Sequence, residues 1–274
     1  MQTERSHTIE VILFYSGFNI FLFEMARAAQ QLGYHFVISA ITEQEFVSTL
    51  ESASSRFVDG LLIVPRSLTT YDYEALIRLT DDIPFVQIGA KLGEDVPAVL
   101  YDQAQGARLA TQHLIDLGHR RIAEISGPLW NHHACDRHES WLKTLKDNGL
   151  EPVASVEGTF EINSGYQAMR QLLSSGADFS AVVVGNDSML MGAHTALREA
   201  GLRVPDDISL VGFDDVPEAE HFLPGITTVR QDFELIGRLA VEYLVNMIEN
   251  PDTVVHQRVL SPRLIVRGTT RRID

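Results

Sequence analysis

Three side chains of this sequence carry complementary hydrogen-bonding chemistry. Asn186 and Asp214 each follow a short apolar run, 181–184 and 208–213, and Arg137 lies upstream of both. A guanidinium group offers donors in a fixed fork, a carboxylate offers acceptors, and an amide offers both. Together they suit the vicinal hydroxyl groups of a small polar ligand, because each hydroxyl both donates and accepts.

Each of these residues also has a purely structural interpretation. Asn186 precedes a helical pattern and could serve only as its N-cap. Asp214 could be a turn residue, and Arg137 could form a surface ion pair. Local sequence alone leaves both interpretations open.

The stretch 181–215 must position two of the three. Residues 181–184 read as a buried strand, 189–200 keep helical spacing up to Gly201, and 208–213 read as a second strand. A strand–helix–strand unit of this length makes its strands parallel. Asn186 and Asp214 then stand just past the carboxyl ends of neighbouring strands, where open α/β sheets bind ligands.

The rest of the chain repeats this alternation, which predicts an α/β fold with parallel sheets in two similar lobes. Strand patterns cover 9–14, 34–41, 57–64, 84–88, 121–125, 153–158, 181–184, 208–213, 227–229, 254–260 and 264–266, with 96–101 as an extended link. Helix patterns cover 20–32, 43–56, 71–80, 104–117, 137–148, 164–174, 189–200 and 233–249.

Composition favours a soluble, cytoplasmic protein. The 274 residues include one cysteine, Cys135, so an internal disulfide is impossible. The start, MQTERSHTIE, is polar, and no apolar run approaches the roughly 20 residues of a membrane span. A formal net charge of −15 argues against direct binding to a phosphate backbone.

Four phrases in order resemble the effector-binding core of the LacI/GalR family of bacterial transcription regulators. They are HLIDLGHRRIAEISGP (113–128), VVVGNDSMLMGAHTALREAGLRVPDDISLVGFDD (182–215), ITTVRQDFELIGRLAVEYL (226–244) and LSPRLIVRGTT (260–270). The resemblance extends over nearly the whole chain from Ile9.

The resemblance implies a periplasmic-binding-protein-like type I fold with two Rossmann-like lobes, three interlobe crossovers and a ligand in the cleft. The lobes would be 1–101 with 231–260 and 102–230 with 261–274. The family's N-terminal helix-turn-helix head has no counterpart before residue 9. Either the head has been removed, or the protein regulates without touching DNA.

The resemblance also implies site residues. Arg137, Asn186 and Asp214 match positions that hold the family's sugar or nucleobase effector, and Phe160 matches a stacking aromatic with a core role as its alternative. Gly89 stands where many members have an acidic or amide residue, which disfavours a typical hexose. The further ligand-binding candidates are Tyr15 and Phe21 on the first lobe, His133 at the pocket rim, and Gln231, with Phe233 beside it.

Metal and enzyme interpretations find less support. One short segment contains four side chains of the types that bind zinc: His132, His133, Cys135 and His138. The sequence offers no second group of candidate ligands elsewhere. The motifs GxSxG, GxGxxG and HExxH and the P-loop are absent, so we expect no enzyme, no cofactor and no metal.

The sequence therefore favours the effector-binding and dimerisation domain of a regulator. Its partners would be a sugar-like effector or, as a second choice, a nucleobase, a second copy of the chain, and operator DNA through the missing head. The alternative is a solute-binding protein of a transport system with the same fold. An enzyme that uses a Rossmann-like cleft is the third possibility.

Overall fold

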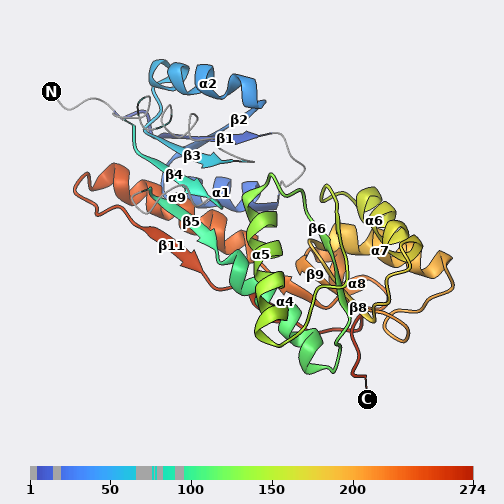
Figure 1. Cartoon of the computed structure of the whole chain (residues 1–274). Coiled ribbons are helices and arrows are strands. Elements are labelled where there is room, and N and C mark those ends of the chain that lie inside the picture. The colour runs from blue at the N-terminus through green and yellow to red at the C-terminus, as the bar shows by residue number, and fades with distance from the viewer. Residues whose placement is uncertain are drawn as a thin grey trace. The chain divides into compact units, whose positions relative to one another are not determined.

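The computed structural model describes residues 5–14, 20–65, 76, 78, 83–89 and 96–273 (Figure 1). The chain divides into two compact units, Met1–Tyr101 with Asp232–Leu260 and Asp102–Gln231 with Ser261–Asp274. It passes from one unit to the other after Tyr101, after Gln231 and after Leu260. Gln231, expected in the first lobe, thus belongs to the second unit.

The first unit contains a sheet whose described pairings are all parallel, in the order β11-β5-β4-β3-β1-β2. Its strands are β1 (Thr8–Phe14), β2 (His35–Ile41), β3 (Gly60–Val64), β4 (Phe85–Ile88), β5 (Ala98–Tyr101) and β11 (Gln257–Leu260). The prediction that 96–101 is only an extended link is wrong. β5 is a buried strand because it pairs with β4 on one side and β11 on the other.

Helices cover both faces of this sheet. α1 (Ile20–Gln31) and α9 (Phe233–Glu249) pack on one face, where Met25 and Tyr243 are fully buried. α2 (Phe46–Ala53), flanked by the short turns η1 (Glu43–Glu45) and η2 (Ser54–Arg56), packs on the other. The helix expected over 71–80 lies largely outside the described residues.

The second unit repeats the design, with the strand order β12-β10-β9-β8-β6-β7. Its strands are β6 (Ile122–Ser126), β7 (Ser155–Glu157), β8 (Ala181–Val184), β9 (Ser209–Asp214), β10 (Thr228–Arg230) and β12 (Arg263–Ile265). β12 runs antiparallel to β10, against the expectation of parallel sheets. The chain reaches β12 directly from the other unit, without the helical crossover that makes neighbouring strands parallel.

α4 (Gln103–Asp116) and α5 (His132–Asp147) cover one face of the second sheet. α6 (Ile162–Ser174) and α7 (Asp187–Glu199) cover the other, and the short α8 (Pro217–His221), which the sequence analysis did not expect, follows β9. Within the described part of the chain, no helix is long and apolar enough to cross a bilayer.

α5 begins at His132, not at Arg137 as expected. The side chain of Asn131 accepts hydrogen bonds from the backbone N–H groups of His133 (3.0 Å) and Ala134 (3.3 Å), and so caps the helix. Arg137 therefore lies in the second turn of a helix, whose backbone fixes the direction of its side chain more firmly than a loop junction would.

The topology brings four chain segments to one edge of the second sheet. β6, β8, β9 and β10 are consecutive neighbours, and their pairings are parallel. Their carboxyl ends therefore lie at the same edge and carry Gly127, Gly185 with Asn186, Asp214 and Gln231.

Candidate functional site

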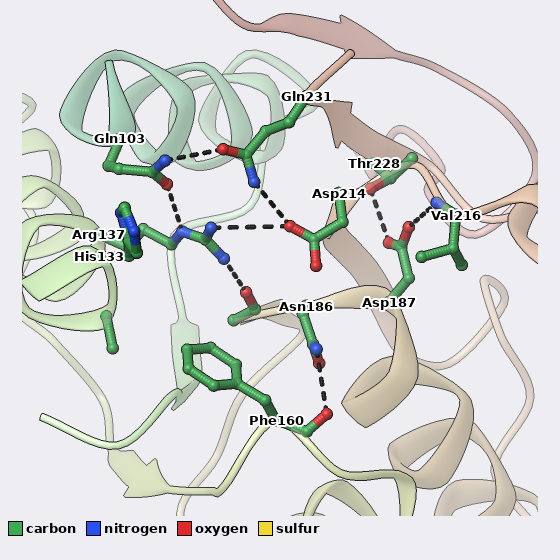
Figure 2. A network of polar contacts seen from close by, with 12 residues as sticks. Gln103, His133, Arg137, Phe160, Asn186, Asp187, Asp214, Val216, Thr228 and Gln231 are labelled. Carbon is green, nitrogen blue, oxygen red and sulfur yellow. Dashed lines mark hydrogen bonds and ion pairs between the residues drawn. The ribbon is translucent and has the colours of Figure 1, made fainter. Parts of the chain in front are cut away.

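Arg137 reaches this edge from α5 and is held at three of its nitrogens (Figure 2). Its Nε donates to Oε1 of Gln103 (2.8 Å), and its Nη1 donates to the carbonyl oxygen of Gly185 (2.5 Å). Its Nη2 lies 3.6 Å from Oδ1 of Asp214, in an ion pair between two largely buried side chains. The guanidinium fork thus has a fixed direction.

Two glutamines close this arrangement into a ring. Gln103 Nε2 donates to Oε1 of Gln231 (2.7 Å), and Gln231 Nε2 donates to Oδ1 of Asp214 (2.8 Å). Arg137 and Asp214 are therefore joined twice, once directly and once through the two amides (Figure 2).

An aromatic ring supports the guanidinium from one side. The Cζ of Arg137 lies 3.7 Å from the centroid of the Phe213 ring, within cation–π range. The ring can occupy this position only because residue 106 is glycine: a Cβ on Gly106 would come within 2.4 Å of Phe213 Cζ. The absence of a side chain at Gly106 thus allows the Phe213 ring to lie where it contacts the guanidinium of Arg137.

Asp214 ends β9 with a left-handed backbone, φ +104°. Burial raises the pKa of its carboxyl, and the positive charge of Arg137 opposes that rise. Oδ1 serves both Arg137 and Gln231, whereas among the described residues Oδ2 has no hydrogen-bond partner. One carboxylate oxygen therefore remains available to a ligand donor.

Asn186 does act as a helix cap, as its structural interpretation expects. Its Oδ1 accepts from the backbone N–H of Met189 (2.9 Å). Its Nδ2 donates to the carbonyl oxygen of Phe160 (3.1 Å), and the residue is only 2% exposed. One amide hydrogen remains for any further contact.

Phe160 contributes a half-buried aromatic ring, and its carbonyl oxygen accepts from Asn186 (Figure 2). Its backbone is left-handed, with φ +70°. The ring packs against Gly127, since a Cβ there would come within 2.3 Å of Phe160 Cζ. A glycine after β6 therefore makes room for the ring.

Known proteins agree with this architecture. The model of the family described as "Periplasmic binding protein-like domain" matches residues 111–270. The lactose operon repressor of Escherichia coli (strain K12) is 33% identical, over 88% of this chain and 68% of the relative. The ribose operon repressor of the same strain is 36% identical, over 98% of this chain and 84% of the relative. A solved complex of the transcriptional regulator CelR with cellobiose is 32% identical, covers 97% of this chain and 85% of its own, and superposes with a TM-score of 0.87.

The chain belongs to the LacI/GalR family. The predicted fold, two lobes of the periplasmic-binding-protein type I, is confirmed. Because the named LacI/GalR relatives are repressors and regulators, they also agree with the expectation that the chain is not an enzyme.

The other residues predicted for the site of this LacI/GalR chain lie outside the ring of Arg137, Gln103, Gln231 and Asp214. His133 lies one helical turn before Arg137, and burial, with the neighbouring positive charge of Arg137, lowers its pKa to about 3, so its ring is neutral. Phe21 lies in the core of the first unit, against Gly237 of α9. Phe233 begins α9, Gly89 follows β4 with φ +90°, and Tyr15 lies outside the described residues.

Two polar residues of the site escaped the sequence analysis. Gln103 is the first residue of α4, immediately after its N-cap Asp102, and its place beside a predicted crossover was the available signal. Asp187 is fully buried; it accepts from Thr228 Oγ1 (2.6 Å) and from the backbone N–H of Val216 (3.1 Å). Burial, reinforced by the charge of Asp214, raises the pKa of Asp187 to about 8.

The histidine and cysteine side chains of α5 were considered as zinc ligands from the sequence. Across the described residues, no group of three or more His, Cys, Asp or Glu side chains is arranged to hold an ion. His138 instead contacts Glu124, with Nδ1 2.6 Å from Oε2.

Proposed function

We propose that this chain is the effector-binding and dimerisation domain of a cytoplasmic LacI/GalR-type transcription regulator. A small polar effector, a sugar or sugar derivative, binds at the edge of the second sheet where Arg137 and Asp214 meet. Effector occupancy controls DNA binding by a separate helix-turn-helix segment, since a chain of net charge −15 is poorly suited to hold a phosphate backbone itself.

The pairing of Arg137 with Asp214 is the observation that carries this proposal. Among the described residues, the guanidinium is held at several nitrogens and still has N–H groups without an acceptor, while Oδ2 of Asp214 has no hydrogen-bond partner. A donor and an acceptor held this close and this rigidly match adjacent hydroxyl groups, which need both. Phe160 adds a flat apolar surface of the kind that covers a sugar face.

The names of the relatives point to the same ligand class. The two operon repressors are named for lactose and ribose, and the CelR structure holds cellobiose. We infer that this chain shares their preference for sugars, while the identity of its own effector follows from the screen below.

A thermal-shift screen tests this function with lactose, ribose, cellobiose, sugar phosphates and a purine base. An effector at 100 times its Kd stabilises the fold by about 2.7 kcal/mol through mass action. Titration calorimetry then compares the wild type with Arg137→Met and Asp214→Asn, and with Arg121→Met as a control that removes an exposed arginine of the same unit. We expect both site variants to lose at least 100-fold in affinity and the control to lose none.

Far-UV circular dichroism establishes that each variant is folded. Asp214→Asn keeps the size of the side chain and an acceptor for Gln231, so it guards against a folding defect in Arg137→Met. Undiminished binding by both folded site variants would refute the proposed site.

A further inference from the structure

Gln103 and Gln231 occupy special places in the chain. Gln103 is the second residue after the first passage between the units, and Gln231 is the last residue before the second passage. Both side chains are buried, 6% and 7% exposed, and both join the ring that contains Arg137 and Asp214. Residues at the first two chain passages therefore contact each other and the proposed effector site.

The hydrogen bonds of this ring have one direction. A guanidinium can only donate and an ionised carboxylate can only accept. With Arg137 at one end and Asp214 at the other, the two amides between them satisfy every bond in a single orientation: Arg137 to Gln103, Gln103 to Gln231, Gln231 to Asp214. The three distances, 2.8, 2.7 and 2.8 Å, show that no bond of the series is stretched.

Simple packing would not require this match. An apolar side chain could fill the same space at Gln103, but it would leave the Nε–H of Arg137 and the Oε1 of Gln231 without partners in a buried site. Such a loss is costly because the buried groups cannot recover their bonds to water. Position 103 thus needs a side chain with both an acceptor for Arg137 and a donor for Gln231, which an amide provides.

We propose that Gln103 is a positioning residue of the effector site, which acts together with Gln231. Its Oε1 fixes the rotation of the Arg137 guanidinium, and its Nε2 orients Gln231, which in turn holds Oδ1 of Asp214 so that Oδ2 faces the ligand. This role rests on the proposed function. It extends that function by making the donor and the acceptor of the site a coupled pair, tied to the residues at two chain passages.

Four variants and one control test this role in titration calorimetry with ribose, lactose and cellobiose as probes. Gln103→Leu removes both bonds and should weaken binding at least tenfold. Gln103→Glu keeps an acceptor for Arg137 but loses the donor to Gln231, so it should bind more weakly than the wild type and at least threefold more tightly than Gln103→Leu. Gln231→Leu should resemble Gln103→Leu, and the double leucine variant should be no worse than about threefold beyond either single one, because the two amides act as one unit. Gln171→Leu, the same change at an exposed position of α6, should have no effect.

A measurement without ligand separates this role from the proposed function. Hydrogen exchange of the Arg137 Nε–H, assigned by the loss of its NMR signal in Arg137→Lys, should be slow in the wild type, in Gln103→Glu and in Gln171→Leu. It should be at least tenfold faster in Gln103→Leu. If no probe binds the wild type, the sugar assignment fails, and this exchange still decides the positioning role. Equal exchange in Gln103→Leu and the wild type, or rapid exchange in Gln103→Glu, would overturn it.

Discussion

The side-chain amide of Asn186 holds the backbone of Phe160: Nδ2 donates a 3.1 Å hydrogen bond to the Phe160 carbonyl oxygen. Phe160 has φ +70°, a conformation that costs a non-glycine residue about 1 kcal/mol. The bond offsets part of that cost and holds the backbone from which the aromatic ring projects. One asparagine therefore caps α7 and sets the position of a proposed ligand-stacking side chain.

Substitutions at Asn186 should separate these two roles. Asn186→Ala loses the cap and the bond to Phe160, and we expect about 2–3 kcal/mol of lost stability. Asn186→Ser restores a cap and should recover about 1 kcal/mol, but its side chain is too short to hold Phe160. Urea denaturation measures the stabilities, and Asn131→Ala, which removes the cap of α5, is the matched control. If the serine variant recovered all of the stability, the bond to Phe160 would be energetically irrelevant.

Gly106→Ala should disturb the support of Arg137. Its new Cβ would come within 2.4 Å of the Phe213 ring, and overpacking of this kind costs about 1–3 kcal/mol. Adding Phe213→Leu should relieve the clash and recover part of the stability, measured by urea denaturation. Effector affinity should not recover, since the ring beneath the guanidinium is then gone. A double variant that regains full affinity would contradict this role of Phe213.

Asp187 should make the protein less stable as the pH rises. Its pKa is about 8 in the folded protein against an ordinary value of 3.8, so the folded state holds an extra proton between these values. The free energy of unfolding should therefore fall across this window, with a slope of up to about 1.4 kcal/mol per pH unit. Urea denaturation from pH 5 to pH 9 measures the slope.

Asp187→Asn is the matching control for this slope. An asparagine keeps one oxygen that can accept from Val216, while its NH2 group takes the place of the oxygen that accepts from Thr228, whose hydroxyl can turn to accept instead. We expect the variant to lose this contribution to the pH slope and to exceed the wild type in stability at pH 8 to 9. An unchanged slope would show that Asp187 is ionised in the folded protein.

The pair of His138 and Glu124 should add a second pH dependence. The 2.6 Å hydrogen bond between His138 Nδ1 and the buried Glu124 carboxylate raises the pKa of His138 above its ordinary 6.5. The resulting stabilisation is fully present below pH 6.5 and is lost as the pH rises through the folded pKa. His138→Asn, which can donate but does not titrate, should abolish this loss in denaturation curves between pH 6 and 9.

Ser155→Ala is the control for that pair. Ser155 Oγ also donates to Glu124, at 2.7 Å, and does not titrate. Its removal should lower the stability by about 1 kcal/mol at every pH and leave the slope in place. A slope that vanished in this variant would contradict the assignment of the pH dependence to His138.

Much of the fold was predictable because strands and helices carry strong local patterns. The helix at 233–249 was predicted with its observed bounds, since its apolar spacing and its start after Asp232 are unambiguous. β5 was missed because its strand character depends on pairing with β11, more than 150 residues away. The start of α5 was missed because HHAC lacks apolar periodicity, and only the cap by Asn131 defines it.

Most residues of the ring were predictable, and Gln103 was not. Asp214 ends a strand and Gln231 follows one, a position that points to the binding edge of a parallel sheet. Gln103 begins a helix whose sequence suggests nothing beyond its cap, and its role appears only when Arg137 and Gln231 lie beside it. The buried role of Asp187 was missed because its neighbour Asn186 occupies the same position after β8 and was taken as the site residue.

The hydrogen bonds between Tyr101 and Asp232 link two of the chain passages between the units. The hydroxyl of Tyr101 accepts from the backbone N–H of Asp232 (2.9 Å) and donates to its carbonyl oxygen (3.1 Å), so the first and second passages are fastened within the first unit. Gln103 and Gln231 fasten them again within the second unit. The first two connections are therefore tied to each other at both ends, so the backbone of one cannot change its conformation there without straining a hydrogen bond to the other.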